Sequence, residues 1–540
     1  MLSKPFVNLF NWNPQLFREI KGRLKTRNVA IAISASLLYQ FIVMTYYLRR
    51  LPQEYGRYVT SDSQYCVEVG KYCTDIEWSS WWLDIFNNLS LILLPLMLIG
   101  GVYMLVGDIA KEQRLGTLNF IRLSPKSSQK ILLGKLLGVP ILIYLAVAIF
   151  LPLHLWANIS SGLPLSWFFA FYGVLIIACC FFYNTSLLLA FLGVTQPWLS
   201  AAITGIFFYL LIALIDEGYS DEINAIIGTH ERNVPLIKMG AIITLRIGQM
   251  IISGLILGSY WIWQAVNRRY RNPNATAINK KQSYCLMGCF QVYLMLCFLL
   301  HNIDHKSTDI LQGSLGLFCA LNLLWFLLVI AMLSPQRQSI QNWARYRHQQ
   351  VNNDQIAIVK GLSISLKQDL IWSEKSPALV AIGINLVITA VIWIAWILFW
   401  QQNNTIKLSA ILILILSFTF ILIYAAIAQF ILLTKVKKPT IWAIGIVSGF
   451  IFIPPIALSL MSINPDIYPC LWLLSAFPSS AMIHSSLAIT PILIAIIGQW
   501  TVLVSVTLLL IRKIKKLGAS DSQKLLTGQK DRRIHSHKNY

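Results

Sequence analysis

The chain contains 540 residues, of which 56% are hydrophobic and only 12% are charged. Because soluble globular proteins carry roughly 25% charged residues, this composition excludes a soluble fold. The formal charge of +22 does not require a nucleic-acid partner, since basic residues also gather in the cytoplasmic loops of membrane proteins. Several apolar runs reach about 20 residues, the length of a helix that crosses a bilayer. The sequence therefore predicts an all-α, polytopic membrane protein.

An amphipathic helix is predicted in the N-terminal segment, residues 1–28. Asn13 is a favoured N-cap residue, and Pro14 is favoured at the first helical position. Apolar side chains then recur at helical spacing, with basic side chains between them. This pattern predicts a helix that lies on the inner leaflet, although a basic flank of the first span would explain the charges alone.

Apolar runs predict about twelve membrane-spanning helices in two halves of six. The predicted spans are 29–48, 85–107, 135–157, 166–192, 198–215, 237–265, 284–301, 310–333, 378–400, 408–434, 440–462 and 487–511. A basic linker at 266–282 separates the first half, 29–265, from the second, 283–511, and a basic tail follows at 512–540. The apolar stretch 467–485 contains two prolines, so we expect it to be re-entrant or interfacial rather than spanning.

The distribution of charge predicts that both termini lie in the cytoplasm. In that orientation the inner segments hold 35 of the 44 Lys and Arg residues but only 8 of the 22 Asp and Glu residues. This is the asymmetry that the positive-inside rule describes. In the long outer segment 49–84, Cys66 and Cys73 are candidates for a disulfide, which an oxidising periplasm would permit.

The longest charged interruption in the first half is Asp108–Lys135, between the second and third predicted spans. It begins with a cluster of charges and continues with a Gly-Thr break and an apolar set. A Ser-Pro pair is predicted to cap and open the next helix. The residues singled out in this stretch are Asp108, Lys111, Glu112, Arg114, Gly116, Thr117, Leu118, Ile121, Ser124 and Pro125. The pattern predicts a short helix, a tight turn and the start of the third span.

The sequence shows no pattern for catalysis or for metal binding. A P-loop is missing, because neither Gly-Lys pair is followed by Ser or Thr. We therefore expect no catalytic residue, no bound cofactor and no metal site in this chain. His301, Asp304 and His305 have ligand-like spacing, but a polar loop is the preferred interpretation. Arg246 and Gln249, on one face of the sixth predicted span, are candidates for a translocation path, with a structural pair to a backbone carbonyl as the alternative.

The order of these elements resembles the type-2 permease subunits of ATP-binding-cassette (ABC) exporters. The resemblance rests on the basic N-terminal helix, the Glu112-x-x-x-Gly116-Thr117-Leu118 motif, the Ser-Pro pair and the Gly-Lys pair at the third span. It covers residues 13–265. It implies that residues 1–28 hold an elbow helix and that Asp108–Lys135 holds a coupling helix, which docks on a separate ATPase chain. It further implies that the partner binds ATP and Mg and that the chain resides in the bacterial plasma (inner) membrane.

In this role Glu112 and Arg114 would pair across the interface with the ATPase, and Leu118 and Ile121 would fill a groove on it. An ordinary basic loop would not need the motif, which is itself a hypothesis that requires structural context. No corresponding element follows the span 408–434. We therefore expect a second permease chain, identical or different, in addition to the ATPase and membrane lipid.

Two other functions stay open at this point. A membrane-embedded lipid or glycan transferase would need acidic or His residues gathered in the outer loops, where the acids are scattered. An ion-coupled secondary carrier usually needs an intramembrane acid, and none accompanies Arg246 in the sixth predicted span.

Overall fold

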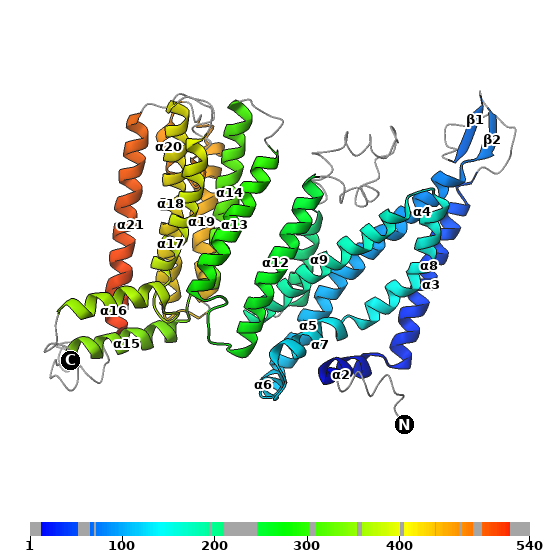
Figure 1. Ribbon diagram of the computed structural model, residues 1–540, viewed down its shortest axis with the longest axis horizontal. Coiled ribbons are helices and arrows are strands. Elements are labelled where there is room, and N and C mark those ends of the chain that lie inside the picture. The colour runs from blue at the N-terminus through cyan, green and yellow to red at the C-terminus, as the bar shows by residue number, and fades with distance from the viewer. Residues whose placement is uncertain are drawn as a thin grey trace, which may run out of the picture. The chain divides into compact units, whose positions relative to one another are not determined.

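The computed structural model describes residues 12–51, 65–69, 72–194, 196–209, 246–301, 308–353, 359–399, 404–437, 439–463, 467–478 and 489–518. It divides the chain into two compact units, Met1–Pro273 (unit 1) and Asn274–Tyr540 (unit 2). The boundary falls inside the stretch 266–282, which was expected to be a linker. The described part of the chain is helical apart from one two-stranded hairpin (Figure 1).

The predicted fold class, all-α and polytopic, is confirmed. Among the described residues, ten helices are long and apolar enough to cross a membrane. The two remaining predicted spans are represented by a shorter apolar helix, Pro197–Tyr209, and by α12 (Arg246–Arg271). The neighbouring residues 210–245 lie outside the described chain.

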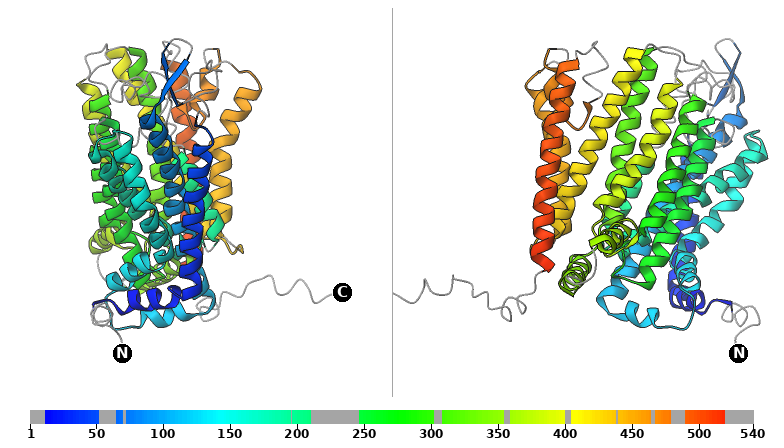
Figure 2. Two further views of the ribbon diagram at one scale, coloured as in Figure 1. Left: turned by 90° about the vertical axis from the view of Figure 1, so that its right-hand side faces the viewer. Right: turned by 60° about the vertical axis from the view of Figure 1, so that its left-hand side comes forward.

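Unit 1 contains the N-terminal helices, the hairpin and the first set of spans. Its elements are α2 (Pro14–Arg23), α3 (Thr26–Leu48), β1 (Cys66–Val69), β2 (Tyr72–Ile76), α4 (Trp78–Pro95), η1 (Leu96–Gly100), α5 (Gly101–Arg114), α6 (Thr117–Arg122), α7 (Ser128–Gly138), α8 (Ile141–Ser160), α9 (Leu165–Phe191) and α12. Helices α3 and α4 pack against α8, while α5 and α12 pack against α9. The hairpin lies at one end of the unit, and α2, α6 and α7 lie at the other (Figure 2).

The second span is one helical path, Trp78–Arg114, with a π-helical turn in its middle. Pro95 directly precedes this turn, and proline distorts a helix because it cannot donate a backbone hydrogen bond. The hydroxyl of Tyr183 in α9 donates to the Met97 carbonyl at 2.6 Å. Gly101 leaves room for it, since a Cβ there would lie 2.0 Å from the Tyr183 oxygen. These contacts hold α5, the second half of this span, against α9.

A buried histidine joins the spans α4, α8 and α9. The His154 ring nitrogens lie 2.9 Å from the Ser90 hydroxyl and 3.0 Å from the Tyr172 hydroxyl. Its ring stacks on Phe86 with the centroids 4.3 Å apart. A polar side chain inside an apolar bundle is costly unless it is hydrogen-bonded, and both ring nitrogens of His154 have partners here.

The hairpin projects from the end of unit 1 opposite to α6. Its strands are antiparallel, with Cys66 opposite Ile76 and Glu68 opposite Cys73. The buried Tyr65 donates a hydrogen bond to Asp84 in α4 at 2.6 Å, which ties the hairpin to the span. The sequence pattern did not predict these strands.

Unit 2 contains a second set of spans and two further helices between them. Its elements are α13 (Lys280–His301), α14 (Thr308–Leu333), α15 (Arg337–Asn353), α16 (Val359–Trp372), α17 (Leu379–Leu398), α18 (Asn404–Leu432), α19 (Pro439–Leu460), α20 (Pro469–Leu473) and α21 (Ile489–Gly518). Helices α15 and α16 lie at one end of the unit and α20 lies at the other (Figure 1). The five-residue helix α20 packs on α21 and is itself too short to span, while residues 479–485 of the stretch 467–485 lie outside the described chain.

Buried polar side chains connect the first three spans of unit 2. The Gln291 amide of α13 donates to Asn322 of α14 at 2.7 Å, and the Trp393 indole of α17 donates to Gln291 at 2.9 Å. Asn385 of α17 also donates to Ser283 of α13 at 3.2 Å. Interhelical hydrogen bonds of this kind hold membrane helices in register.

Candidate functional site

The stretch Asp108–Lys135 folds into the end of α5, the short helix α6 and the helix α7. Helix α5 continues the second span as far as Arg114. Gly116 then adopts a φ of +72°, a left-handed conformation that L residues rarely adopt, and α6 starts at the next residue. No heavy atom lies within 4 Å of a Cβ built on Gly116. This glycine therefore serves the backbone turn rather than a close approach, and the predicted break at Gly116-Thr117 is present.

The helix after α6 begins later than the sequence pattern predicts. Ser124 and Pro125 lie in a non-helical turn, and Ser127 is the N-cap of α7. Proline at position 140 then separates α7 from the third span, α8. Lys135 consequently lies in a separate helix outside the span, whereas the sequence analysis expected it to open the span.

The apolar side chains of this turn divide into a buried set and an exposed set. Leu118 and Ile121 are only 3% and 8% exposed, so they pack inside unit 1. The sequence pattern had instead predicted that they fill a groove on a partner. Leu115, Phe120 and Leu123 are 65%, 81% and 84% exposed. We call these three residues the apolar tip. Large exposed apolar side chains gathered in one short surface segment are typical of an interaction site.

The exposed charges around the apolar tip are all basic. They are Lys111, Arg114, Lys126 and Lys130. The two acids of the stretch, Asp108 and Glu112, lie on the other face of α5, and Glu112 is only 9% exposed. The sequence pattern predicted that Glu112 and Arg114 both pair with an ATPase. Arg114 is exposed, but Glu112 is buried and does not lie at the surface.

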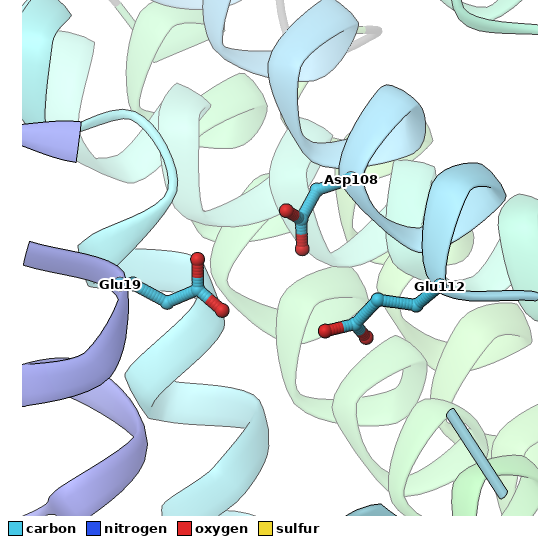
Figure 3. A group of neighbouring side chains, drawn as sticks. All are labelled: Glu19, Asp108 and Glu112. Carbon is cyan, nitrogen blue, oxygen red and sulfur yellow. The ribbon is translucent and has the colours of Figure 1, made fainter. Parts of the chain in front are cut away.

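Asp108 and Glu112 converge on Glu19 of α2 (Figure 3). One carboxylate oxygen from each of the three side chains lies within 4.8 Å of the others. The Lys135 ammonium of α7 lies 2.7 Å from Asp108 Oδ2, 2.8 Å from Glu112 Oε1 and 3.4 Å from Glu19 Oε1. One lysine thus joins α2 to α5 from the side of α7.

Two arginines of α2 complete this arrangement. Arg18 Nη2 lies 2.8 Å from Glu112 Oε1, and Arg23 Nη2 lies 2.6 Å from Asp108 Oδ1. Three carboxylates therefore face three cationic side chains, and their formal charges cancel. We call Arg18, Glu19, Arg23, Asp108, Glu112 and Lys135 the ionic cluster. It links α2, α5 and α7, and α5 directly precedes α6 in the chain.

The three carboxylates of the ionic cluster are close enough to hold a metal ion, but Lys135 already supplies the cation. Its side chain is fully buried, with Nζ in contact with all three acids. Burial lowers the pKa of Lys135, but the carboxylates of Asp108, Glu19 and Glu112 more than offset this, so the pKa lies above its ordinary value. The arrangement is a buried ion-pair network rather than a set of metal ligands.

Helix α2 lies directly on α7 because α7 carries glycine where the two helices meet. A Cβ at Gly138 would lie 2.6 Å from Glu19 Cβ, and one at Gly134 would lie 2.8 Å from the α2 backbone. Asn13 caps α2 as predicted, and its amide also donates to the Lys130 carbonyl at 2.7 Å. The N-terminal helix is therefore fastened to the Asp108–Lys135 stretch rather than only to the first span.

The opposite side of α6 rests on the ends of α9 and α12. The Arg122 guanidinium lies 6.0 Å from the Phe191 ring centroid and 5.5 Å from the Tyr270 ring centroid. Arg271 Nε donates to the Ser128 hydroxyl at 2.8 Å, which ties the end of α12 to the start of α7. A pocket of about 200 Å³ beside α6 is lined by residues of α5, α6, α9 and α12. A displacement of α6 would therefore act directly on α5, α9 and α12.

The other predicted site residues do not join this site. Helix α12 is described from Arg246 onward, but the Arg246 side chain lies outside the described residues, and Gln249 is exposed. Cys66 is disulfide-bonded, whereas the side chain of Cys73 is not among those described. The side chains of His301, Asp304 and His305 likewise fall outside the described part of the chain.

Helix α2 contributes half of the ionic cluster, Arg18, Glu19 and Arg23, and this was not predicted from the sequence. A signal was present, because Glu19 is the only acid among the six basic residues of segment 1–28. A lone acid in a basic helix is expected to have a specific cationic partner. The identity of that partner, Lys135, depends on the break before α8 and was not readable from spacing.

Comparison of the chain with known protein families, with curated proteins and with solved structures finds no match. What is shown is therefore a polytopic helical membrane protein in which the ionic cluster holds the Asp108–Lys135 stretch against α2.

Proposed function

We propose that this chain is the membrane-spanning permease subunit of an ABC exporter and that α6 docks on a separate ATPase chain. The observation that carries this proposal is the apolar tip. Phe120 is exposed on the six-residue helix α6, and Leu115 and Leu123 are exposed just before and just after it. Only the short turn at Gly116 separates α6 from α5, which continues the second span. A force applied to α6 would pass into the span without an intervening flexible segment.

The ionic cluster supports this role because it holds the end of α5, which directly precedes α6, in a fixed position. A coupling element must transmit displacement, and a loop that bends under load would absorb it. The buried pairs of Lys135 with Asp108, Glu112 and Glu19 hold α5 and α7 against α2. Breaking a buried pair costs about 3–5 kcal/mol, so the three helices are expected to move as one body.

The charge around the apolar tip indicates the chemistry of the partner surface. Lys111, Arg114, Lys126 and Lys130 are exposed, whereas both acids of the stretch are engaged in the ionic cluster. The matching surface on the ATPase is therefore an apolar groove with acidic residues at its rim. Complementary rim charges mainly raise the association rate and make it sensitive to salt.

The proposal includes an orientation and a location. The α6 side faces the cytoplasm of a bacterium, in accord with the 35 basic residues of the predicted inner segments, and the chain resides in the plasma membrane. ATP and Mg bind to the partner, and this chain carries out no hydrolysis.

The proposal is tested by ATP hydrolysis of the co-expressed ATPase, with the permease reconstituted in nanodiscs. We expect the permease to stimulate hydrolysis and Phe120→Asp to abolish the stimulation, because a carboxylate would have to be buried in an apolar groove. Phe399→Asp is the matched control, since Phe399 is 86% exposed at the end of α17 remote from α15. Phe120→Leu should retain stimulation. Equal stimulation by wild type and Phe120→Asp would contradict the proposal.

A further inference from the structure

Unit 2 contains its helices in the same order as unit 1. In unit 1 two spans, α3 and α4–α5, precede the surface helix α6, and the spans α8 and α9 follow it. In unit 2 two spans, α13 and α14, precede the surface helices α15 and α16, and the spans α17 and α18 follow them. Among the described residues, an apolar helix follows in each unit, Pro197–Tyr209 or α19, and a long helix comes last, α12 or α21, with the short α20 before α21.

Three helix pairings recur in the two units, although α4 also packs on α8 and α17 on α18 without an equally extensive counterpart. The first span packs on the third in each unit, as α3 on α8 and as α13 on α17. The second packs on the fourth, as α5 on α9 and as α14 on α18. The fourth packs on the sixth, as α9 on α12 and as α18 on α21, and this is the most extensive helix pair of each unit. Shared order together with shared pairing indicates two copies of one architecture.

The surface helices of the two units rest on corresponding places. In unit 1, Arg122 of α6 lies over rings at the ends of the fourth and sixth spans. In unit 2, Ile340 of α15 forms a buried apolar cluster with Leu433, just after the fourth span, and with Leu510 of the sixth span. Helix α15 also contacts Gly518 at the end of α21 through the Ala344 carbonyl. The contacts differ in chemistry, but their position in the bundle is the same.

A short polar segment joins the last helix of unit 1 to the first span of unit 2. Arg271, at the end of α12, contacts Ser128 near α6. Only the polar, non-helical residues 272–279 then precede α13, and such a segment does not cross a bilayer. Within unit 2, the Ala277 amide donates to the Met332 carbonyl at the end of α14, and α15 begins directly after that. The segments 108–135 and 334–376 are both predicted inner segments by their basic residues, so α6, α15 and α16 are all expected to face the cytoplasm.

We infer that unit 2 is a second permease half and that α15 and α16 form a second docking element, so one chain recruits two ATPase chains. The inference rests on the proposed function and replaces the separate second permease that the sequence analysis expected. The position after 408–434, where no second element occurs, lies one pair of spans beyond the position that corresponds to α6, which is after α14.

The second docking element is held together by fewer charged side chains than the first. Arg347 of α15 pairs with Asp369 of α16, and the Trp343 indole donates to the same carboxylate at 3.4 Å. The two helices are thereby held together, as α5 and α7 are held by the ionic cluster. Tyr346 is 55% exposed and Leu366 is 41% exposed, beside the exposed Arg345 and Lys367. The surface is basic and partly apolar like the apolar tip, so it suits the same kind of partner.

Site-directed photocrosslinking tests this inference without disturbing the fold. A benzoyl-phenylalanine is introduced at Phe120, at Tyr346 or at Phe399, all of which are exposed aromatic positions. Under irradiation of the complex with its ATPase, we expect adducts to the ATPase from positions 120 and 346 and none from position 399. Adducts from 120 but not from 346 overturn the inference and leave the proposed function intact. Adducts from neither 120 nor 346 overturn both.

The mass of the purified complex gives an independent measurement. Native mass spectrometry should find one permease chain with two ATPase chains, and Tyr346→Asp should reduce the ATPase content twofold. Two permease chains with two ATPase chains would overturn the inference alone. A permease that carries no ATPase under any condition would overturn the proposed function together with it.

Discussion

Replacement of Lys135 by methionine is the sharpest perturbation of the ionic cluster. Lys135 has no exposed side-chain surface, and its ammonium contacts three carboxylates at 2.7, 2.8 and 3.4 Å. Methionine fills a similar volume but leaves Glu19, Asp108 and Glu112 with only Arg18 and Arg23 as counterions. Loss of one partner from a buried ion pair costs about 3–5 kcal/mol. We expect unit 1 to lose stability by that amount.

The assay is the free energy of unfolding in mixed micelles, measured for Lys135→Met and for Lys111→Met. Lys111 is exposed on α5, so the same chemical change there should cost less than about 0.5 kcal/mol. Addition of Asp108→Asn to Lys135→Met restores the balance of charge, with two acids facing two arginines. The double variant should therefore recover a substantial part of the lost stability. A loss for Lys135→Met no larger than that for Lys111→Met, or a double variant less stable than the single one, would refute the reasoning.

Further predictions concern the turn, the α2–α7 contact and the buried histidine. Gly116→Ala places a side chain at a φ of +72°, which should cost about 1–2 kcal/mol in the same unfolding assay and should weaken ATPase stimulation. Gly138→Leu should separate α2 from α7, since even a Cβ would lie 2.6 Å from Glu19 Cβ, and limited trypsin digestion should then cleave at Arg23 faster than in wild type, where its guanidinium pairs with Asp108. His154→Phe keeps the stacked ring but leaves two hydroxyls without their partner, and should lower the free energy of unfolding by about 1–3 kcal/mol. High salt should slow binding of the ATPase measured by surface plasmon resonance, because the exposed charges around the apolar tip are basic.

A raised pKa at Lys135 also sets a pH dependence. Because the folded-state pKa lies above the ordinary lysine value, the lysine contributes its full stabilisation below the unfolded-state pKa, and that contribution is lost only as the pH rises through the folded-state pKa. The difference in unfolding free energy between wild type and Lys135→Met should therefore stay constant from pH 7 to about pH 9. A difference that shrinks by half over that interval would show that Lys135 is not held protonated by its three acids.

Much of the fold could be predicted from the sequence, because a helix that crosses a bilayer needs about 20 consecutive apolar residues. Ten of the predicted spans correspond to long apolar helices, and the capped start of α2 at Asn13-Pro14 is present as predicted. Local chemistry also located the break at Gly116. The start of α7 was misplaced, because Ser124-Pro125 and Ser127 are both plausible starts and only the packing of α7 on α2 selects the later one.

The candidate site was less predictable, since burial depends on tertiary contacts. Spacing placed Glu112, Leu118 and Ile121 on a turn, but it did not show that all three face inward while Phe120 and Leu123 face outward. Leu118 and Ile121, which were expected at the surface, are buried. Similarly, the correspondence between the two units lies in helix order and helix pairing, which no short motif reports.

The most direct test of the central claim is purification of the tagged chain from its native membrane in mild detergent. We predict that mass spectrometry of the purified material identifies an ATPase with a P-loop, and that Leu123→Asp removes it while the yield of the permease is unchanged. Leu123 is 84% exposed, so this substitution should not disturb folding. Recovery of the wild-type chain without any such ATPase, or equal recovery of the ATPase with Leu123→Asp, would contradict the account.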